Sequence, residues 1–298
     1  MGQSVKRTQT SAFGTSGREG HDSSKFYQKR LYQDLEVKAQ ANSQTKDNSP
    51  EQLDVIHHAD SRNMHHLPDN SVHLMITSPP YNVGKEYDAD LTLSEYVDLL
   101  AEVMSEVYRV LVEGGRACIN IANVGRTPYI PLHLYLTEIA HACGFYMRGE
   151  IIWDKGASAG TSCAWGSWKS SSNPVLRDVH EYILVFCKGT FKRHPIRQNS
   201  IGRDDFLEST KSIWRFPATS AKKARHPAPF PVELPRRLIH LYSFVGDNVL
   251  DPFMGSGTTA EAAIETGRHY IGYEINEEYV AVAKNRVNSL FSLSANID

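Results

Sequence analysis

Two hydrophobic patterns alternate along most of the chain. From Tyr96 to Leu111, apolar side chains recur at the three- and four-residue spacing of an amphipathic helix. This pattern predicts a helix that Ser94 caps and that Gly114 and Gly115 end. Further helices are predicted over 130–144, 232–243, 258–267 and 277–291. Short apolar runs predict strands at 73–76, 116–123, 149–154, 181–188, 248–253 and 269–274.

The order of these elements predicts the fold class and the domain organisation. Strands that are separated by helices form a mostly parallel sheet with helices on both faces, so we expect an α/β fold. Residues 1–50 have the composition of a polar extension followed by a linker. Residues 51–188 and 226–298 contain the predicted elements, whereas residues 189–225 show no clear periodicity.

Composition excludes several classes of protein. The 298 residues are 41% hydrophobic and 22% charged, which is ordinary for a globular cytoplasmic protein. No apolar run reaches the roughly 18 residues that cross a membrane, and the N-terminus lacks the apolar core of a signal peptide. The four cysteines have no paired spacing and the 13 histidines are dispersed, so we predict reduced thiols and no structural metal.

Charge is unevenly distributed, although the formal net charge is only −2. Residues 188–225 hold ten basic and three acidic side chains, a net charge of +7. Residues 227–298 hold five basic and nine acidic ones, a net charge of −4. A basic segment on a neutral to acidic body is typical of a protein that binds a polyanion at one place. On charge alone, a solvated basic loop is an equally good interpretation.

A glycine-rich turn after the strand 248–253 predicts a cofactor site. Gly255 and Gly257 form the turn, and Glu274 ends the next strand, where a carboxylate can hold ribose hydroxyls. No lysine follows the glycines, which rejects a nucleoside triphosphate, and Ala260 at the third glycine position weakens a dinucleotide without excluding it. An adenosine cofactor with a small carboxylate end remains, and S-adenosylmethionine fits that description.

The strand 73–76 runs into the sequence TSPPYN, which predicts a second part of the same site. Proline fixes φ and donates no hydrogen bond, so Pro79 and Pro80 form a rigid turn with free carbonyls. Ser78 adds a hydroxyl acceptor and Tyr81 an aromatic surface. Because ligands bind beyond the carboxyl ends of parallel strands, we expect this turn to face the cofactor loop. Rigid acceptors beside an aromatic ring suit a planar group with an exocyclic amine, aimed at a sulfonium methyl.

These motifs resemble those of amino-group DNA methyltransferases, which are related to restriction–modification enzymes. The resemblance covers roughly residues 50–298: TSPPY resembles the catalytic motif, DPFMGSGTT the cofactor motif, and residues 226–239 the segment before it. Catalytic motif first, basic region next and cofactor motif last is the order of the β group. The resemblance implies a circularly permuted Rossmann-like fold with a mostly parallel, seven-stranded sheet. It makes residues 189–225 a small target recognition insert and double-stranded DNA the partner.

The resemblance also assigns roles to single residues. Ser78 and the Pro79 carbonyl would accept from the target amine beside Pro80, and Tyr81 would stack on the flipped base. The implied cofactor contacts are Asp60, His226, Pro227, Phe230, Asp251, Phe253, Gly255, Gly257, Thr258 and Glu274. The implied DNA contacts are Arg193, Arg197, Arg203, Lys211, Arg215, Lys222, Lys223, Arg225, Trp165 and Trp168. For the two tryptophans, burial against the sheet is an equally good interpretation.

Ser78 favours cytosine as the target base. Family members with SPP are mostly cytosine-N4 enzymes, and those with DPPY or NPPY are mostly adenine-N6 enzymes. A C5-cytosine enzyme is excluded because it needs a cysteine after a proline, and no cysteine here follows one. Adenine-N6 methylation of DNA, methylation of RNA or of a protein glutamine, and a catalytically silent DNA-binding protein remain alternatives. A cognate restriction endonuclease and a homodimer remain open as partners.

Overall fold

The computed structural model describes residues 27–32, 47–81, 91–156, 166–219 and 230–294. The chain divides into a small N-terminal unit of residues 1–42 and a large unit of residues 43–298. In the small unit, the 3-10 helix η1 spans Arg30–Tyr32. In the large unit, the backbone N–H of Asn48 donates to the carbonyl of Asn70 at 2.8 Å. The end of the predicted linker is therefore bonded to the folded body.

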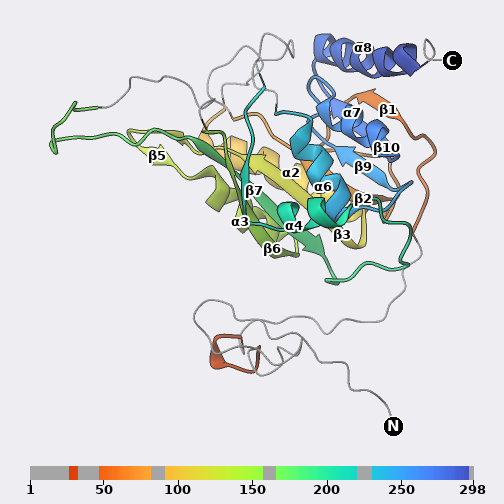
Figure 1. Ribbon diagram of the computed structural model, residues 1–298, viewed down its shortest axis with the longest axis horizontal. Coiled ribbons are helices and arrows are strands. Elements are labelled where there is room, and N and C mark those ends of the chain that lie inside the picture. The colour runs from red at the N-terminus through yellow and green to blue at the C-terminus, as the bar shows by residue number, and fades with distance from the viewer. Residues whose placement is uncertain (1–26, 33–46, 82–90, 157–165, 220–229, 295–298) are drawn as a thin grey trace. The chain divides into compact units, whose positions relative to one another are not determined.

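An eight-stranded sheet forms the centre of the large unit, in the order β1-β10-β9-β2-β3-β7-β6-β8 (Figure 1). The strands are β1 (Val55–His58), β2 (Val72–Thr77), β3 (Leu111–Ile121), β6 (Phe145–Asp154), β7 (His180–Lys188), β8 (Ile213–Arg215), β9 (Asn248–Asp251) and β10 (His269–Glu274). β4 (Val124–Gly125) and β5 (Tyr129–Ile130) pair separately. Of the eight strands in the described sheet, β7 runs antiparallel to its neighbours and the others share one direction. The predicted α/β fold is confirmed, with one strand more than the seven expected.

Helices cover both faces of this sheet (Figure 1). They are α2 (Leu93–Val110), α3 (Leu132–Ala142), α4 (Arg203–Ser209), α6 (Glu233–Tyr242), α7 (Thr258–Glu265) and α8 (Glu277–Ser294). Among the helices of the described ranges, none combines the length and the apolar character that a membrane crossing needs.

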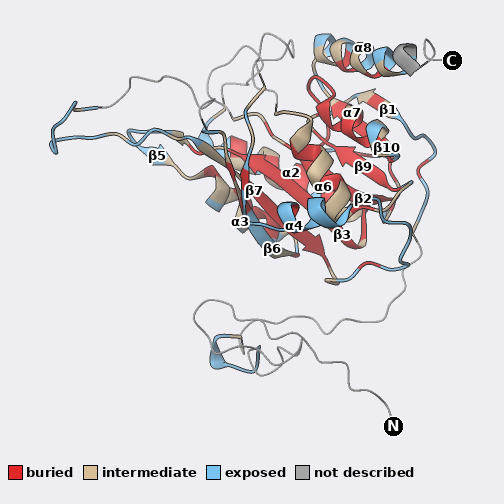
Figure 2. Cartoon of the chain, viewed as in Figure 1, coloured by how far each residue is buried: buried red, intermediate tan, exposed pale blue. Residues whose placement is uncertain are grey.

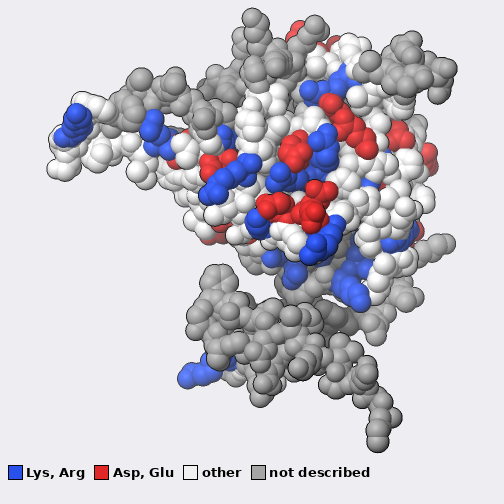
Figure 3. All heavy atoms as spheres, viewed as in Figure 1, with Lys and Arg blue, Asp and Glu red and all other residues white. Residues whose placement is uncertain are grey.

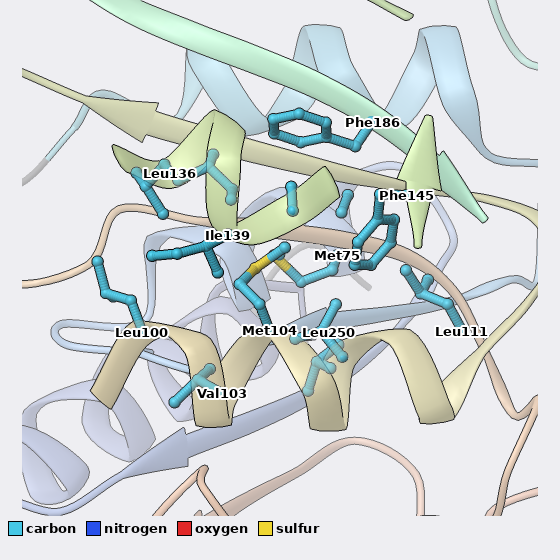
Figure 4. Close-up of a cluster of buried hydrophobic side chains, with 14 of the residues drawn as sticks. Met75, Leu100, Val103, Met104, Leu111, Leu136, Ile139, Phe145, Phe186 and Leu250 are labelled. Atoms are coloured by element: carbon cyan, nitrogen blue, oxygen red, sulfur yellow. The ribbon is translucent and has the colours of Figure 1, made fainter. Parts of the chain in front are cut away.

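Two hydrophobic clusters, one on each face, hold the helices to the sheet. Side chains of α2 and α3 form one cluster, and those of α6, α7 and α8 form the other. On β2, Met75 belongs to the first cluster, whereas Leu74 and Ile76 belong to the second, as expected for a strand whose side chains alternate. Figure 4 shows Met75 and Leu250 of the sheet among the side chains of the first cluster. The strands β2, β3, β7, β9 and β10 are accordingly buried along most of their length (Figure 2).

The helix α2 differs from its prediction at both ends. It begins after Thr92, not Ser94, because Thr92 and Glu95 form a reciprocal capping box. It ends at Val110, and β3 then passes through the glycine pair. Gly114 has φ +75°, and a Cβ there would lie 2.9 Å from the Cα of Arg193. The glycine therefore permits close contact with another segment and does not stop the helix.

Part of the basic segment 189–225 joins the main sheet. α4 and β8 lie in this segment, and β8 pairs with β6 so that Trp214 lies opposite Trp153. Both indoles are buried, and each donates to a backbone carbonyl, Trp214 to Ser209 and Trp153 to Phe216. The described part of the segment is therefore anchored on the main sheet by aromatic packing.

Candidate active site

The predicted cofactor loop and catalytic turn lie at the same edge of the sheet. Strands that share a direction end together, and their register aligns Glu274 with His58 and Thr77 with Ile119. Because β7 is antiparallel, its first residues reach this edge as well, where His180 pairs with Asp154 of β6. The edge therefore collects residues from β1, β2, β3, β6, β7, β9 and β10, as expected for an open parallel sheet.

The cofactor loop is held by the carboxylate of Glu274. One oxygen accepts from the backbone N–H of Gly255 at 2.9 Å, and the other accepts from that of Asn276 at 2.9 Å. Gly257 caps α7 at φ +82°, and a Cβ there would lie 3.0 Å from the Cβ of Ala283 in α8. A side chain at this position would be strained and would press on α8. The loop, the start of α7 and the fixed acid fit an adenosine cofactor.

Other predicted cofactor residues lie at the same edge. The backbone N–H of Ala59 donates to the Glu274 carbonyl at 3.1 Å, which places Asp60 beside the loop, where Asp60 pairs with Arg62 at 2.6 Å. Phe253 is partly buried in the first cluster, and Phe230 packs against the second. Thr258 is buried, and its hydroxyl accepts from Arg286 at 2.6 Å. His226 and Pro227 lie outside the described residues.

Asp251 is a correction, because it cannot touch a cofactor directly. Its side chain is 1% exposed. One carboxylate oxygen accepts from the Thr77 hydroxyl at 2.6 Å and the other from the Thr259 hydroxyl at 2.6 Å, while the Phe253 backbone N–H donates at 3.1 Å. These bonds join the end of β2, which precedes the catalytic turn, to the first turn of α7. Asp251 therefore holds the two halves of the site together.

The buried carboxyl of Asp251 makes folding pH-dependent. Burial raises its pKa from 3.8 to about 6, against the hydrogen bonds that lower it. A raised folded-state pKa means that the native protein binds the proton more tightly, so this contribution to stability is lost as pH rises through 6. We expect the unfolding free energy of wild type to fall by about 3 kcal/mol relative to Asp251→Asn between pH 4 and pH 8, at about 1.4 kcal/mol per unit. Urea unfolding at several pH values measures this difference, and a difference that does not vary with pH would contradict it.

The catalytic turn is braced from two sides. The carbonyl of Pro80 accepts from the Tyr96 hydroxyl of α2 at 2.7 Å, and Pro79 is buried. Ser78 is partly exposed, and its hydroxyl lies 3.1 Å from that of Tyr81. The ring of Tyr81 packs against the first hydrophobic cluster. The turn therefore holds its serine in one place at the edge of the sheet.

Tyr81 joins a polar cluster that the sequence analysis did not find. The Tyr81 cluster consists of Ser78, Tyr81, Asn120, Lys155 and Glu181. The Tyr81 hydroxyl donates to Glu181 at 3.2 Å, the Asn120 amide donates to Glu181 at 2.6 Å, and Lys155 pairs with the second Glu181 oxygen at 2.8 Å. Burial and the nearby Glu181 charge raise the pKa of Tyr81 well above 10.0, so the phenol keeps its proton at neutral pH.

Comparison with known proteins decides the family. The family model N6_N4_Mtase, described as DNA methylase, matches residues 72–285. The chain belongs to this DNA methylase family. It is 34% identical over 283 residues to the type II methyltransferase M.MjaI of Methanocaldococcus jannaschii, covering 78% of this chain and 93% of that protein. It is 30% identical over 256 residues to the DNA adenine methyltransferase YhdJ of Escherichia coli, covering 81% and 84%.

A solved structure supports the same fold. TTHA0409 of Thermus thermophilus, in complex with S-adenosyl-L-methionine, is 32% identical and has a TM-score of 0.64. The match covers 78% of this chain and 93% of that one. The α/β methyltransferase fold expected from the sequence is therefore confirmed.

Arg193 is a second correction, this time to the DNA contacts that the resemblance implied in this methylase. Its guanidinium side chain is 7% exposed and forms a two-pronged ion pair with Asp247, which is fully buried. The guanidinium also lies 4.6 Å from the ring of Phe244. A buried and paired guanidinium cannot reach a phosphate, so Arg193 belongs to the core.

The other implied DNA contacts of the methylase vary in exposure. Arg203 and Arg215 are 88% and 77% exposed, and each lies near an aspartate, Asp204 at 3.8 Å and Asp154 at 3.2 Å. Lys211 pairs with Glu208, and Arg197, 41% exposed, lies 3.7 Å from Asp247. Trp168 is 63% exposed, which argues against its burial in the sheet. Basic and acidic side chains are intermixed on the face drawn in Figure 3. Trp165, Lys222, Lys223 and Arg225 lie outside the described residues.

Proposed function

We propose that the protein transfers a methyl group from S-adenosylmethionine to the N4 amino group of cytosine at a specific site in double-stranded DNA. The observation that carries the proposal is the bond pair at Asp251, which connects Thr77, next to the catalytic serine, with Thr259 of the cofactor helix. This connection sets the acceptors of the turn beside the cofactor loop. Membership of the DNA methylase family supplies the substrate class.

The chain's own residues then have separate tasks. S-adenosylmethionine supplies an electrophilic methyl group. Glu274 and the loop of Gly255 would hold this cofactor. The target base would leave the duplex and lie against Tyr81. Its amine would donate to the Ser78 hydroxyl and to the Pro79 carbonyl, which takes part in no hydrogen bond within the described residues. Two such acceptors hold the nitrogen in line for direct transfer, without a covalent intermediate. The N–C bond forms as the S–C bond breaks, S-adenosylhomocysteine leaves, and the methylated nitrogen gives up one proton to solvent.

Adenine-N6 methylation on the same scaffold is the second candidate. The relative YhdJ carries the name of a DNA adenine methyltransferase and is 30% identical to this chain. The resemblance of the SPP sequence favours cytosine. Cytosine and adenine, however, would present the same kind of exocyclic amine to Ser78. A cognate endonuclease and a homodimer stay predictions from the resemblance.

Replacing Glu274 tests the cofactor site. We expect Glu274→Gln to weaken S-adenosylmethionine binding by about 10- to 100-fold, because one or two charge-assisted hydrogen bonds are lost. Isothermal titration calorimetry measures the affinity without DNA. Glu277→Gln is the matched control, since Glu277 is exposed in the first turn of α8 and should bind like wild type. Equal affinity of wild type and Glu274→Gln would remove Glu274 from the site.

Transfer of a labelled methyl group tests the substrate class. The purified protein is incubated with tritiated S-adenosylmethionine and, in separate reactions, with unmethylated duplex DNA, single-stranded DNA, RNA or a protein extract. The proposal predicts label in duplex DNA above all others, and sequencing of the product maps the site. Label in RNA or protein alone, or in none of the four, would overturn it.

A further inference from the structure

The hydrogen bonds that Glu181 accepts in the Tyr81 cluster have a fixed direction. Glu181 is an acceptor at both oxygens, because the Lys155 ammonium lies 2.8 Å from one and the Asn120 amide lies 2.6 Å from the other. Exchanging the oxygen and nitrogen of the Asn120 amide would place two acceptor oxygens face to face, so the amide orientation is fixed. Glu181 is 13% exposed at its side chain, so water replaces few of these partners.

The phenol of Tyr81 sets the direction of the hydrogen bond to Ser78. A phenol has one proton, and it lies towards Glu181 at 3.2 Å. The Tyr81 oxygen can then only accept, from the Asn120 amide at 3.3 Å and from Ser78 at 3.1 Å. The Ser78 proton therefore points at Tyr81, away from the base. Its lone pairs remain for an incoming amine.

We propose that Glu181 is a positioning residue that, through Tyr81, makes the Ser78 hydroxyl a hydrogen-bond acceptor and so selects a base that presents an amine. This inference rests on the proposed function and names what the site recognises: an exocyclic NH₂ and not a carbonyl oxygen. It applies to cytosine against uracil, and equally to adenine against hypoxanthine. The sequence would place Glu181 in the site only if β7 were known to run antiparallel. In a parallel strand, Glu181 would lie at the opposite edge of the sheet from Ser78.

Replacing Glu181 by glutamine should reverse the chain of bonds. Glutamine has one acceptor oxygen, and the Lys155 ammonium attracts it. The glutamine NH₂ then faces both Tyr81 and the Asn120 amide, so the Tyr81 proton loses its carboxylate acceptor and is free to turn to Ser78. The serine proton turns towards the base, where it meets the amine as a second donor. A uracil carbonyl oxygen at the same place would instead accept a hydrogen bond from the serine.

The test measures base preference without the cofactor. Duplexes carrying the mapped site, with cytosine or uracil opposite guanine at the target, are titrated with each variant by fluorescence anisotropy. The mismatch of the uracil duplex is the same for every variant, so the ratio of the two Kd values reports the serine's polarity. We expect Kd(uracil)/Kd(cytosine) to be about tenfold lower for Glu181→Gln than for wild type, the effect of one mispaired hydrogen bond. Glu150→Gln, an exposed carboxylate on β6, should leave the ratio unchanged.

A double-mutant cycle separates this role from a structural one. Glu181→Gln should lower kcat about 100-fold with KM for S-adenosylmethionine unchanged. The reason is that the serine proton would face the hydrogens of the target amine in the transition state as well. In a Tyr81→Phe background, which removes the hydroxyl that links the two residues, Glu181→Gln should change kcat less than about threefold. If Glu181→Gln does not fold, Tyr81→Phe alone should already move the Kd ratio towards one.

The outcomes are distinct. An unchanged Kd ratio, or kcat losses that multiply in the double variant, would overturn the role of Glu181 while methylation by wild type leaves the proposed function standing. If wild type transfers no methyl group to an amino group of DNA, the proposed function is overturned, and this inference with it.

Discussion

Ser78→Ala is expected to lower kcat by about 100- to 1000-fold and to leave S-adenosylmethionine affinity within twofold of wild type. The substitution removes one of the two acceptors that hold the target amine, and losing one fixed hydrogen-bond partner of the reacting group typically costs this much. The cofactor loop is bound by Glu274, whereas the Ser78 hydroxyl bonds with Tyr81, so the affinity for S-adenosylmethionine should persist. Methyl transfer at saturating DNA measures kcat, and calorimetry measures affinity.

The control for this variant is Ser105→Ala. Ser105 is an exposed serine on α2, and its loss should leave turnover at the wild-type level. Wild-type turnover by Ser78→Ala would remove the serine from the reaction. Loss of both turnover and cofactor binding would mean that the turn supports the cofactor loop and does not select the amine.

Arg193→Ala is expected to lower the unfolding free energy by about 3–5 kcal/mol, because it leaves the carboxylate of Asp247 buried without its cation. Asp247 keeps the Phe244 backbone N–H and lies 3.7 Å from Arg197, but neither replaces the two-pronged pair. Urea unfolding measures the loss. The slope of DNA affinity against salt should stay as in wild type, because a buried guanidinium releases no counterion.

Arg203→Ala is the matched control, and it should change DNA binding but not stability. Its side chain is 88% exposed, so we expect stability within about 0.5 kcal/mol of wild type. As a phosphate contact it should weaken DNA binding and reduce the salt slope by about one. A stable Arg193→Ala with a reduced salt slope would restore the original assignment of Arg193 to DNA.

The sequence predicted the framework of the site well, and the reason is physical. Alternating strands and helices, and the carboxyl-end rule for parallel sheets, place Ser78 and Glu274 at one edge from periodicity alone. The residues that were missed or misassigned depend on tertiary partners. Asp251 looks like a cofactor ligand until Thr77 and Thr259 are seen on its two oxygens.

Strand direction and burial explain the remaining differences. Glu181 enters the site because β7 reverses direction, which an apolar run does not reveal. Arg193 is one of ten basic residues between 188 and 225, and nothing in the local sequence separates the one that is buried opposite Asp247. The strand β8 has three residues, too few for a period-2 pattern, and only its pairing with Ile152, Trp153 and Asp154 of β6 defines it.

The most direct test of the proposed function is to identify the methylated base. The purified protein is incubated with S-adenosylmethionine carrying a CD₃ group and with unmethylated genomic DNA, and the hydrolysed nucleosides are separated by mass spectrometry. The proposed function predicts deuterated N4-methylcytosine in wild type and its near absence with Ser78→Ala. Deuterated N6-methyladenine in place of N4-methylcytosine would contradict the assignment of cytosine, and no deuterated nucleoside at all would contradict DNA methylation.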